Sequence, residues 1–192
     1  MVLIFRVLLG LMRGLIRGKV RGALDDSVIR LTVLPTDADL YFHLNNGRYL
    51  SLSDLGRLDL AMGSGLWRVM LRNRWFPVAA SSTARFRKSI DLFRRFDLRS
   101  RLVGWDTKWI YVAHWFELDG EIAATILFRV VFLKGREAIA PSTLFEAMGI
   151  EAEAERVPEW IRHWKETEER IKPMMNRATE EPGEEIDREQ VE

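Results

Sequence analysis

Residues 47–69 form an apolar segment of helical length, and no second helix separates the extended segments that follow it. The segment is rich in leucine with small residues interspersed, which predicts a helix buried on most sides and broken near the Gly-Ser-Gly at 63–65. Strands are predicted at residues 27–33, 78–90, 95–105, 108–117 and 121–133. One strand, one helix and four consecutive strands favour an α+β fold, in which an antiparallel sheet of about five strands wraps around one long central helix.

Shorter patterns mark the connections between these elements. The dipeptide Asp119-Gly120 between two apolar runs is a strong hairpin signal. Residues 141–149 predict one or two helical turns with Ser142 or Thr143 as the N-cap, and Pro158 predicts the start of a C-terminal helix. The chain therefore divides into a basic segment (1–26), a folded domain (27–150), a region containing a helix (151–176) and an acidic tail (177–192) that is predicted to be disordered.

The composition excludes several classes of function. The net charge is +1, the three histidines are scattered, and the chain has no cysteine. A zinc cluster, a disulfide framework and thiol catalysis are therefore excluded, and nothing in the charge favours a nucleic-acid partner. We expect no metal and no redox cofactor. The lack of cysteine fits a cytoplasmic protein.

The N-terminal 22 residues carry five basic residues and no acidic residue. As a helix, this segment would place Arg6, Arg13 and Arg17 on one side, opposite an apolar face. That apolar face comprises Phe5, Leu8, Leu9, Met12, Leu15 and Ile16. No apolar run here approaches the ~20 residues that span a bilayer. Two interpretations stay open: the segment lies on a membrane surface, or its apolar face docks on the folded domain.

The stretch "LPTDADLYFHLNNGRYLSLSDLGR" at residues 34–57 concentrates polar groups just before the apolar helix. Hydrolysis at a carbonyl carbon needs one carboxylate, acting as nucleophile or as base for water, and donors for the oxyanion. Backbone N–H groups at the start of a helix are unpaired and lie at its positive dipole end. Asn46, Gly47 and Arg48 would supply such groups if they open the helix. The residues of this stretch have structural explanations too, as turn, capping and surface-pair residues.

The same stretch resembles the signature of hot-dog-fold acyl-CoA thioesterases of the 4-hydroxybenzoyl-CoA thioesterase-like group. The matching residues are His43, Leu44, Asn45, Asn46, Tyr49, Leu50, Asp54 and Arg57. Residues 95–116 are similar to the branch called thioesterase superfamily member six-like. The resemblance covers roughly residues 27–150 and implies a hot-dog fold and hydrolysis of an acyl-CoA.

The resemblance also implies roles for individual residues. The family's catalytic aspartate lies ten residues before the aromatic residue that enters the helix, which selects Asp39 rather than Asp37. His43 and Asn46 complete the predicted catalytic set. The residues predicted to bind substrate are Asn45, Gly47 and Tyr49 and a basic cluster of Arg85, Arg87 and Lys88. Such a cluster suits the phosphates of CoA, although it also fits a solvated rim of the sheet. Asp54 and Arg57 are interpreted as a structural pair on the helix surface.

Hot-dog relatives form dimers with the substrate at the interface, so we expect at least a homodimer. Two other functions remain open from the sequence. The chain could bind an acyl-CoA or a lipid without hydrolysing it, or it could act at a membrane surface through residues 1–22.

Overall fold

The computed structural model describes residues 6–8, 10–12 and 22–177. The chain divides into two compact units, residues 1–156 and residues 157–192. In the second unit α5 (Glu159–Arg177) begins directly after Pro158, as the sequence predicts. The tail from residue 178 lies outside the described residues, so its disorder stays a prediction. Within the described ranges, no helix is long and apolar enough to cross a membrane.

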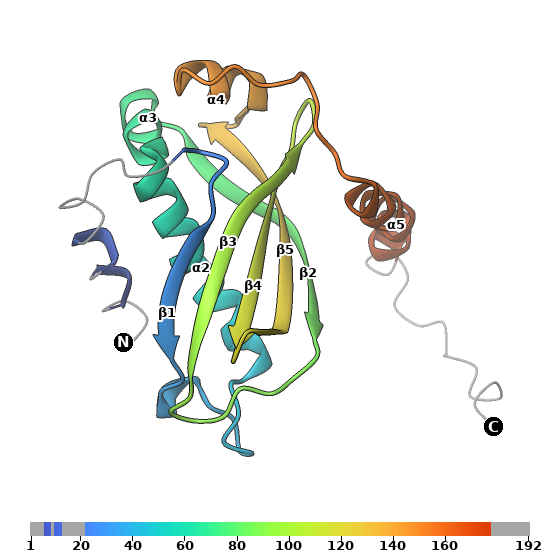
Figure 1. Ribbon diagram of the computed structural model, residues 1–192. Coiled ribbons are helices and arrows are strands. Elements are labelled where there is room, and N and C mark those ends of the chain that lie inside the picture. The colour runs from blue at the N-terminus through green and yellow to red at the C-terminus, as the bar shows by residue number, and fades with distance from the viewer. Residues whose placement is uncertain (1–5, 9, 13–21, 178–192) are drawn as a thin grey trace. The chain divides into compact units, whose positions relative to one another are not determined.

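The first unit contains one antiparallel sheet. Its strands lie in the order β1-β3-β4-β5-β2, with β6 beside β5 (Figure 1). The strands are β1 (Ser27–Thr32), β2 (Phe76–Phe86), β3 (Arg95–Trp105), β4 (Ile110–Leu118), β5 (Glu121–Lys134) and β6 (Glu137–Ile139). Asp119 and Gly120 join β4 to β5 with φ angles of 54° and 81°. Positive φ at both positions is what a type I′ hairpin turn requires, so the predicted hairpin is confirmed.

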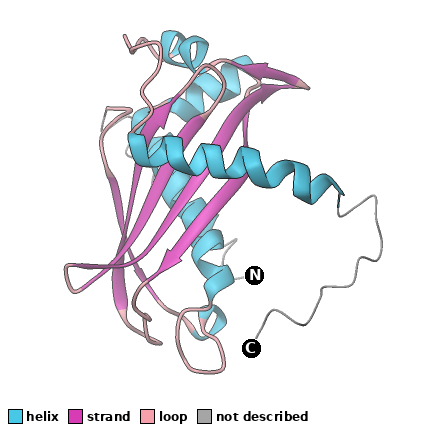
Figure 2. Ribbon diagram, turned by 90° about the vertical axis from the view of Figure 1, so that its right-hand side faces the viewer, coloured by secondary structure: helices cyan, strands magenta, loops and turns pink. Residues whose placement is uncertain are grey.

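The long helix α2 (Asn46–Ser64) packs against this sheet, as Figures 1 and 2 show. It ends at Gly65, whose φ of 78° is left-handed, and α3 (Leu66–Asn73) follows. The predicted break near residues 63–65 is therefore confirmed. Tyr49, Leu52 and Leu55 of α2 are buried in the core. Only glycine fits at position 56, because a Cβ there would lie 2.2 Å from Ser100 Oγ on β3.

Burial alternates along the first half of β3, where Phe96, Leu98 and Ser100 are buried and the residues between them are not. The predicted cap of the short helix α4 (Pro141–Ala147) is wrong. Its N-cap is Ala140, which makes no side-chain capping bond, and Pro141 is the first helical residue. Proline suits that position because its missing N–H would be unpaired there anyway. Ser142 and Thr143 therefore lie two and three residues past the N-cap position and cannot cap the helix.

The edge strand β2 is exposed along nearly its whole length. Phe76, Val78 and Phe86 are among its exposed apolar residues. Its one partner among the described strands is β5. An unpaired strand edge of this length invites pairing with another chain.

Within the N-terminal segment, residues 6–8 and 10–12 are helical. The side that faces the domain carries Arg6, which bonds to Asp37, and Val7, which packs on the core. Leu8 and Met12 point outward and are 54% and 57% exposed. Docking through an apolar face that includes Leu8 and Met12 is therefore wrong for these residues. The remaining residues of the predicted faces lie outside the described ranges.

Candidate active site

The polar stretch forms a loop at the end of β1 and pairs with the connection between β2 and β3. After β1 the chain makes a single 3-10 turn (Pro35–Asp37). The backbone N–H of Leu44 then donates to Ile90 O at 2.8 Å, and Leu92 N–H donates to Phe42 O at 2.8 Å. These bonds hold the loop in one defined conformation at the start of α2.

The carboxylate of Asp39 is oriented by the backbone of its own loop. Its Oδ1 accepts hydrogen bonds from the N–H groups of Tyr41 (2.9 Å) and His43 (3.1 Å). In the described part of the chain, no hydrogen bond uses Oδ2, and the residue is half-buried. Burial, together with the negative charge of Asp39, raises the pKa of Tyr49 to about 12. Asp39 therefore has a fixed carboxylate close to the start of α2, and its Oδ2 is available for a reaction.

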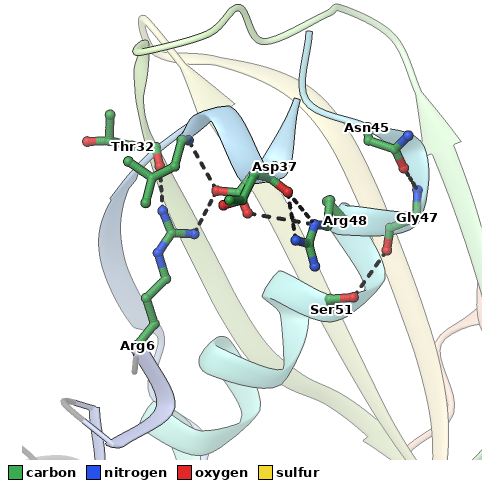
Figure 3. A network of polar contacts seen from close by, with 9 residues as sticks. Arg6, Thr32, Asp37, Asn45, Gly47, Arg48 and Ser51 are labelled. Carbon is green, nitrogen blue, oxygen red and sulfur yellow. Dashed lines mark hydrogen bonds and ion pairs between the residues drawn. The ribbon is translucent and has the colours of Figure 1, made fainter. Parts of the chain in front are cut away.

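Asp37 has a different environment, which Figure 3 shows. Its side chain is buried, and Oδ2 accepts hydrogen bonds from Arg6 Nη1 (2.9 Å) and from Leu34 N–H (3.1 Å). Arg48 Nε lies 3.8 Å from Oδ1. Both oxygens are therefore engaged in contacts that tie β1, the N-terminal segment and α2 together. Asp37 is a structural residue, and no local sequence pattern predicts its pairing with Arg6.

His43 contributes its backbone, rather than its ring, to the position of Asp39. Its N–H and C=O both bond to Asp39, while ring atom Nε2 lies 3.5 Å from Asp91 Oδ1. The main chain of His43, and not its ring, therefore orients Asp39. Asp91 was missed because it is remote in sequence and reaches His43 only through the pairing of the two loops.

Asn45 caps α2 and occupies two of the three amides that were expected to meet the substrate. Its Oδ1 accepts from Gly47 N–H at 2.9 Å, and its carbonyl accepts from Arg48 N–H at 2.8 Å. Asn46 is the exposed first residue of the helix. Gly47 N–H thus reaches a substrate oxygen only when the Asn45 side chain turns away.

Tyr49 is buried, with 2% of its surface exposed. Its ring packs edge-on against two others, and its centroid lies 5.0 Å from that of Phe86 and 4.7 Å from that of Phe116. Tyr49 therefore fixes the start of α2 in the core. Its predicted contact with substrate is not visible in this packing.

The basic cluster lies at the end of β2 and in the connection that follows it. Arg85 is exposed on β2. Arg87 and Lys88 both approach Glu121 at the β4–β5 hairpin, at 3.3 and 3.6 Å. These two cations are therefore partly neutralised within the chain, and they remain exposed to an incoming anion.

The predicted pair of Asp54 and Arg57 forms, but it is not a simple surface pair. Arg57 lies over the ring of Phe128, 3.9 Å from its centroid. Burial lowers the pKa of Arg57, and the charge of Asp54 partly offsets this. Both residues line a cavity of about 300 Å³ between α2, α3, α4 and the sheet. This cavity forms from residues scattered between positions 23 and 148, so no local sequence pattern predicts it.

A family profile described as the thioesterase-like superfamily matches residues 33–165. The chain belongs to this superfamily. Protein THEM6 of Xenopus laevis is 34% identical over 134 residues, covering 69% of this chain and 63% of that protein. A probable thioesterase of Saccharomyces cerevisiae, YBR096W, is 32% identical over 120 residues, covering 60% of this chain and 52% of the yeast protein. The chain thus spans about half to two thirds of the length of these relatives.

Solved structures of the superfamily share the fold. The probable thioesterase YbaW of Escherichia coli superposes with a TM-score of 0.59 at 24% identity, covering 63% of this chain and 95% of that one. A DHNA-CoA thioesterase of Staphylococcus aureus has a TM-score of 0.54 at 14% identity, covering 80% and 95%. The predicted hot-dog fold and the resemblance to the member-six-like branch are therefore confirmed.

Proposed function

We propose that this chain is an acyl-CoA thioesterase in which Asp39 is the essential carboxylate. The observation that carries the proposal is the geometry of that carboxylate. Backbone N–H groups hold Oδ1, while Oδ2 is left to act on water or on the thioester carbonyl. Superfamily membership supports hydrolysis, and one structural neighbour, SAV2348 of Staphylococcus aureus, was solved in complex with CoA.

The proposed reaction needs little beyond this loop. Asp39 accepts a proton from water as the water oxygen attacks the carbonyl carbon, or it attacks directly and water then cleaves the anhydride. The carbon–sulfur bond breaks, and CoA leaves as a thiolate that takes up a proton. Gly47 N–H stabilises the oxyanion once the Asn45 side chain releases it. Arg85, Arg87 and Lys88 bind the phosphates of CoA, and no cofactor takes part.

The alternative is a protein that binds acyl-CoA without hydrolysing it. One observation favours it: Gly47 N–H already donates to Asn45 Oδ1. A panel of acyl-CoAs incubated with the purified protein and a thiol reagent separates the two functions. Release of free CoA with repeated turnover supports the enzyme. Saturable binding of the same acyl-CoAs without thiol release refutes hydrolysis and supports the alternative.

We also propose a homodimer that pairs through β2, because this edge strand exposes apolar residues along its length. Val78→Glu on β2 should shift the protein to monomer in light scattering. Val28→Glu is the matched control, since Val28 is exposed on β1 at the opposite edge of the sheet. A protein that is monomeric before any substitution, at micromolar concentration, contradicts the proposal.

Contact with a membrane is proposed for the outward side of the N-terminal segment. Leu8 and Met12 are exposed there, while Arg6 is held by Asp37. The double substitution Leu8→Glu and Met12→Glu should reduce flotation with anionic vesicles and leave folding unchanged. Equal flotation of both proteins would assign the segment to the folded domain alone. Such a contact would make a cytoplasmic protein peripherally membrane-associated.

A further inference from the structure

The cavity of about 300 Å³ lies at the opposite end of α2 from the Asp39 loop. Its lining is almost wholly apolar and includes Leu58 and Ala61 of α2, Leu102 of β3, Val130 of β5 and Leu144 of α4. The volume is at the lower end of the range for small-molecule sites, and the chemistry of the lining suits a hydrocarbon. It is a feature of the first unit alone.

Charge is confined to Asp54 and Arg57 among the residues that line this cavity. The rest of the lining is apolar except for Ser64, whose hydroxyl donates to Leu60 O. A buried polar head group would therefore carry a large desolvation cost there. A ligand with one apolar tail and one polar end therefore enters with its tail leading and leaves its polar part on the side of Asp54 and Arg57. Half of the Asp54 side chain is exposed, so this is the side open to solvent.

The same side of α2 connects the cavity to the reaction site. Gly47, Leu50, Asp54 and Ala61 repeat at intervals of three, four and seven residues, so they lie along one face of the helix. At about 1.5 Å per residue, Asp54 is about 10 Å and Ala61 about 21 Å along the helix from Gly47. An aromatic or short acyl group bound at the loop would end well before the cavity. A fully extended octadecanoyl chain is about as long as the distance from Gly47 to Ala61, so it would reach the far part of the cavity.

We infer that the cavity binds the distal part of a long-chain aliphatic acyl group, running along α2 from the Asp39 loop. This inference rests on the proposed thioesterase function and adds the substrate class to it. Burial of each methylene should improve binding about fourfold. Octadecanoyl-CoA should accordingly be bound and hydrolysed in preference to butyryl-CoA and benzoyl-CoA.

The test fills the cavity without touching the loop. Ala61→Phe should weaken binding of octadecanoic acid, measured by calorimetry on the full chain, by ~10-fold or more, because it displaces several methylenes. Ala61→Val is a smaller change that keeps the test valid if the larger side chain prevents folding. Ala138→Phe is the matched control, since Ala138 is exposed on β6 and does not line the cavity. Binding by the control should stay within twofold of the wild type.

Hydrolysis gives the second measurement. Filling the cavity should lower kcat/KM for octadecanoyl-CoA by ~10-fold and leave that for butyryl-CoA within about twofold. Loss of octadecanoic acid binding in the Ala61 variants of a protein that releases no thiol would support the cavity site and overturn the thioesterase proposal. Thiol release with unchanged preference for chain length in the Ala61 variants would overturn the cavity site and leave the thioesterase proposal standing. Absence of octadecanoic acid binding to the wild type would also overturn the cavity site.

Discussion

Asp39 and His43 are joined through the main chain: Asp39 Oδ1 accepts the His43 N–H at 3.1 Å, and Asp39 N–H donates to His43 O at 2.8 Å. The imidazole takes no part in either bond and lies 3.5 Å from Asp91 instead. The carboxylate is therefore positioned by backbone atoms that a side-chain substitution does not remove.

His43→Ala should accordingly reduce hydrolysis only moderately, by about tenfold or less, since proton transfer by the ring would be worth ~100-fold or more. The measurement is kcat/KM with a fixed acyl-CoA. A loss as large as that expected for Asp39→Asn would show that the ring acts directly in the reaction.

Asp37→Asn should destabilise the fold rather than act on chemistry. The substitution leaves Arg6 and Arg48 beside an uncharged amide, which should lower the free energy of unfolding by about 2 kcal/mol or more. Asp97→Asn is the control, because the Arg30–Asp97 pair is largely exposed and should be worth at most about 1 kcal/mol. Equal losses in urea denaturation would contradict the structural role of Asp37.

Gly56→Ala should be poorly tolerated, because its Cβ would lie 2.2 Å from Ser100 Oγ and 3.0 Å from His114 Nδ1. We expect a loss of about 1–3 kcal/mol in the free energy of unfolding. Removing the hydroxyl with Ser100→Ala should recover part of this loss, although alone it costs the 2.7 Å hydrogen bond to His114. A double-mutant cycle measures the coupling, and purely additive losses would argue against the close approach.

His114 should make stability depend on pH. Burial, and to a smaller extent the charge of Arg57, lowers the pKa of His114 from 6.5 to about 3. The unfolded state therefore binds a proton that the folded state excludes as the pH falls below about 6.5, and the contribution to stability is lost between there and about pH 3. Over this pH range, His114 lowers the free energy of unfolding by at most about 1.4 kcal/mol for each pH unit of acidification. Urea unfolding at pH 7 and pH 5 should show a smaller difference for His114→Gln than for the wild type, and equal differences would refute this role.

Most of the fold could be predicted from the periodicity of apolar residues, because buried positions on α2 and alternating positions on β3 leave regular patterns in the sequence. The candidate site was harder to predict. The Arg6–Asp37 and His43–Asp91 contacts join segments far apart in sequence, and no local pattern encodes them. The N-cap of α4 was misplaced because Ser142 and Thr143 are good capping residues, yet Pro141 fixes the first helical position ahead of them.

The most direct test is kcat/KM for acyl-CoA hydrolysis by Asp39→Asn relative to the wild type. The amide keeps the size and most hydrogen bonds of the carboxylate but removes its basicity, so we expect a loss of ~100-fold or more with little change in stability. Asp91→Asn makes the same chemical change on the other side of His43 and should cost far less. Thioesterase activity that survives Asp39→Asn would contradict the assignment, and residues 34–57 would then be the structural entry to a buried helix.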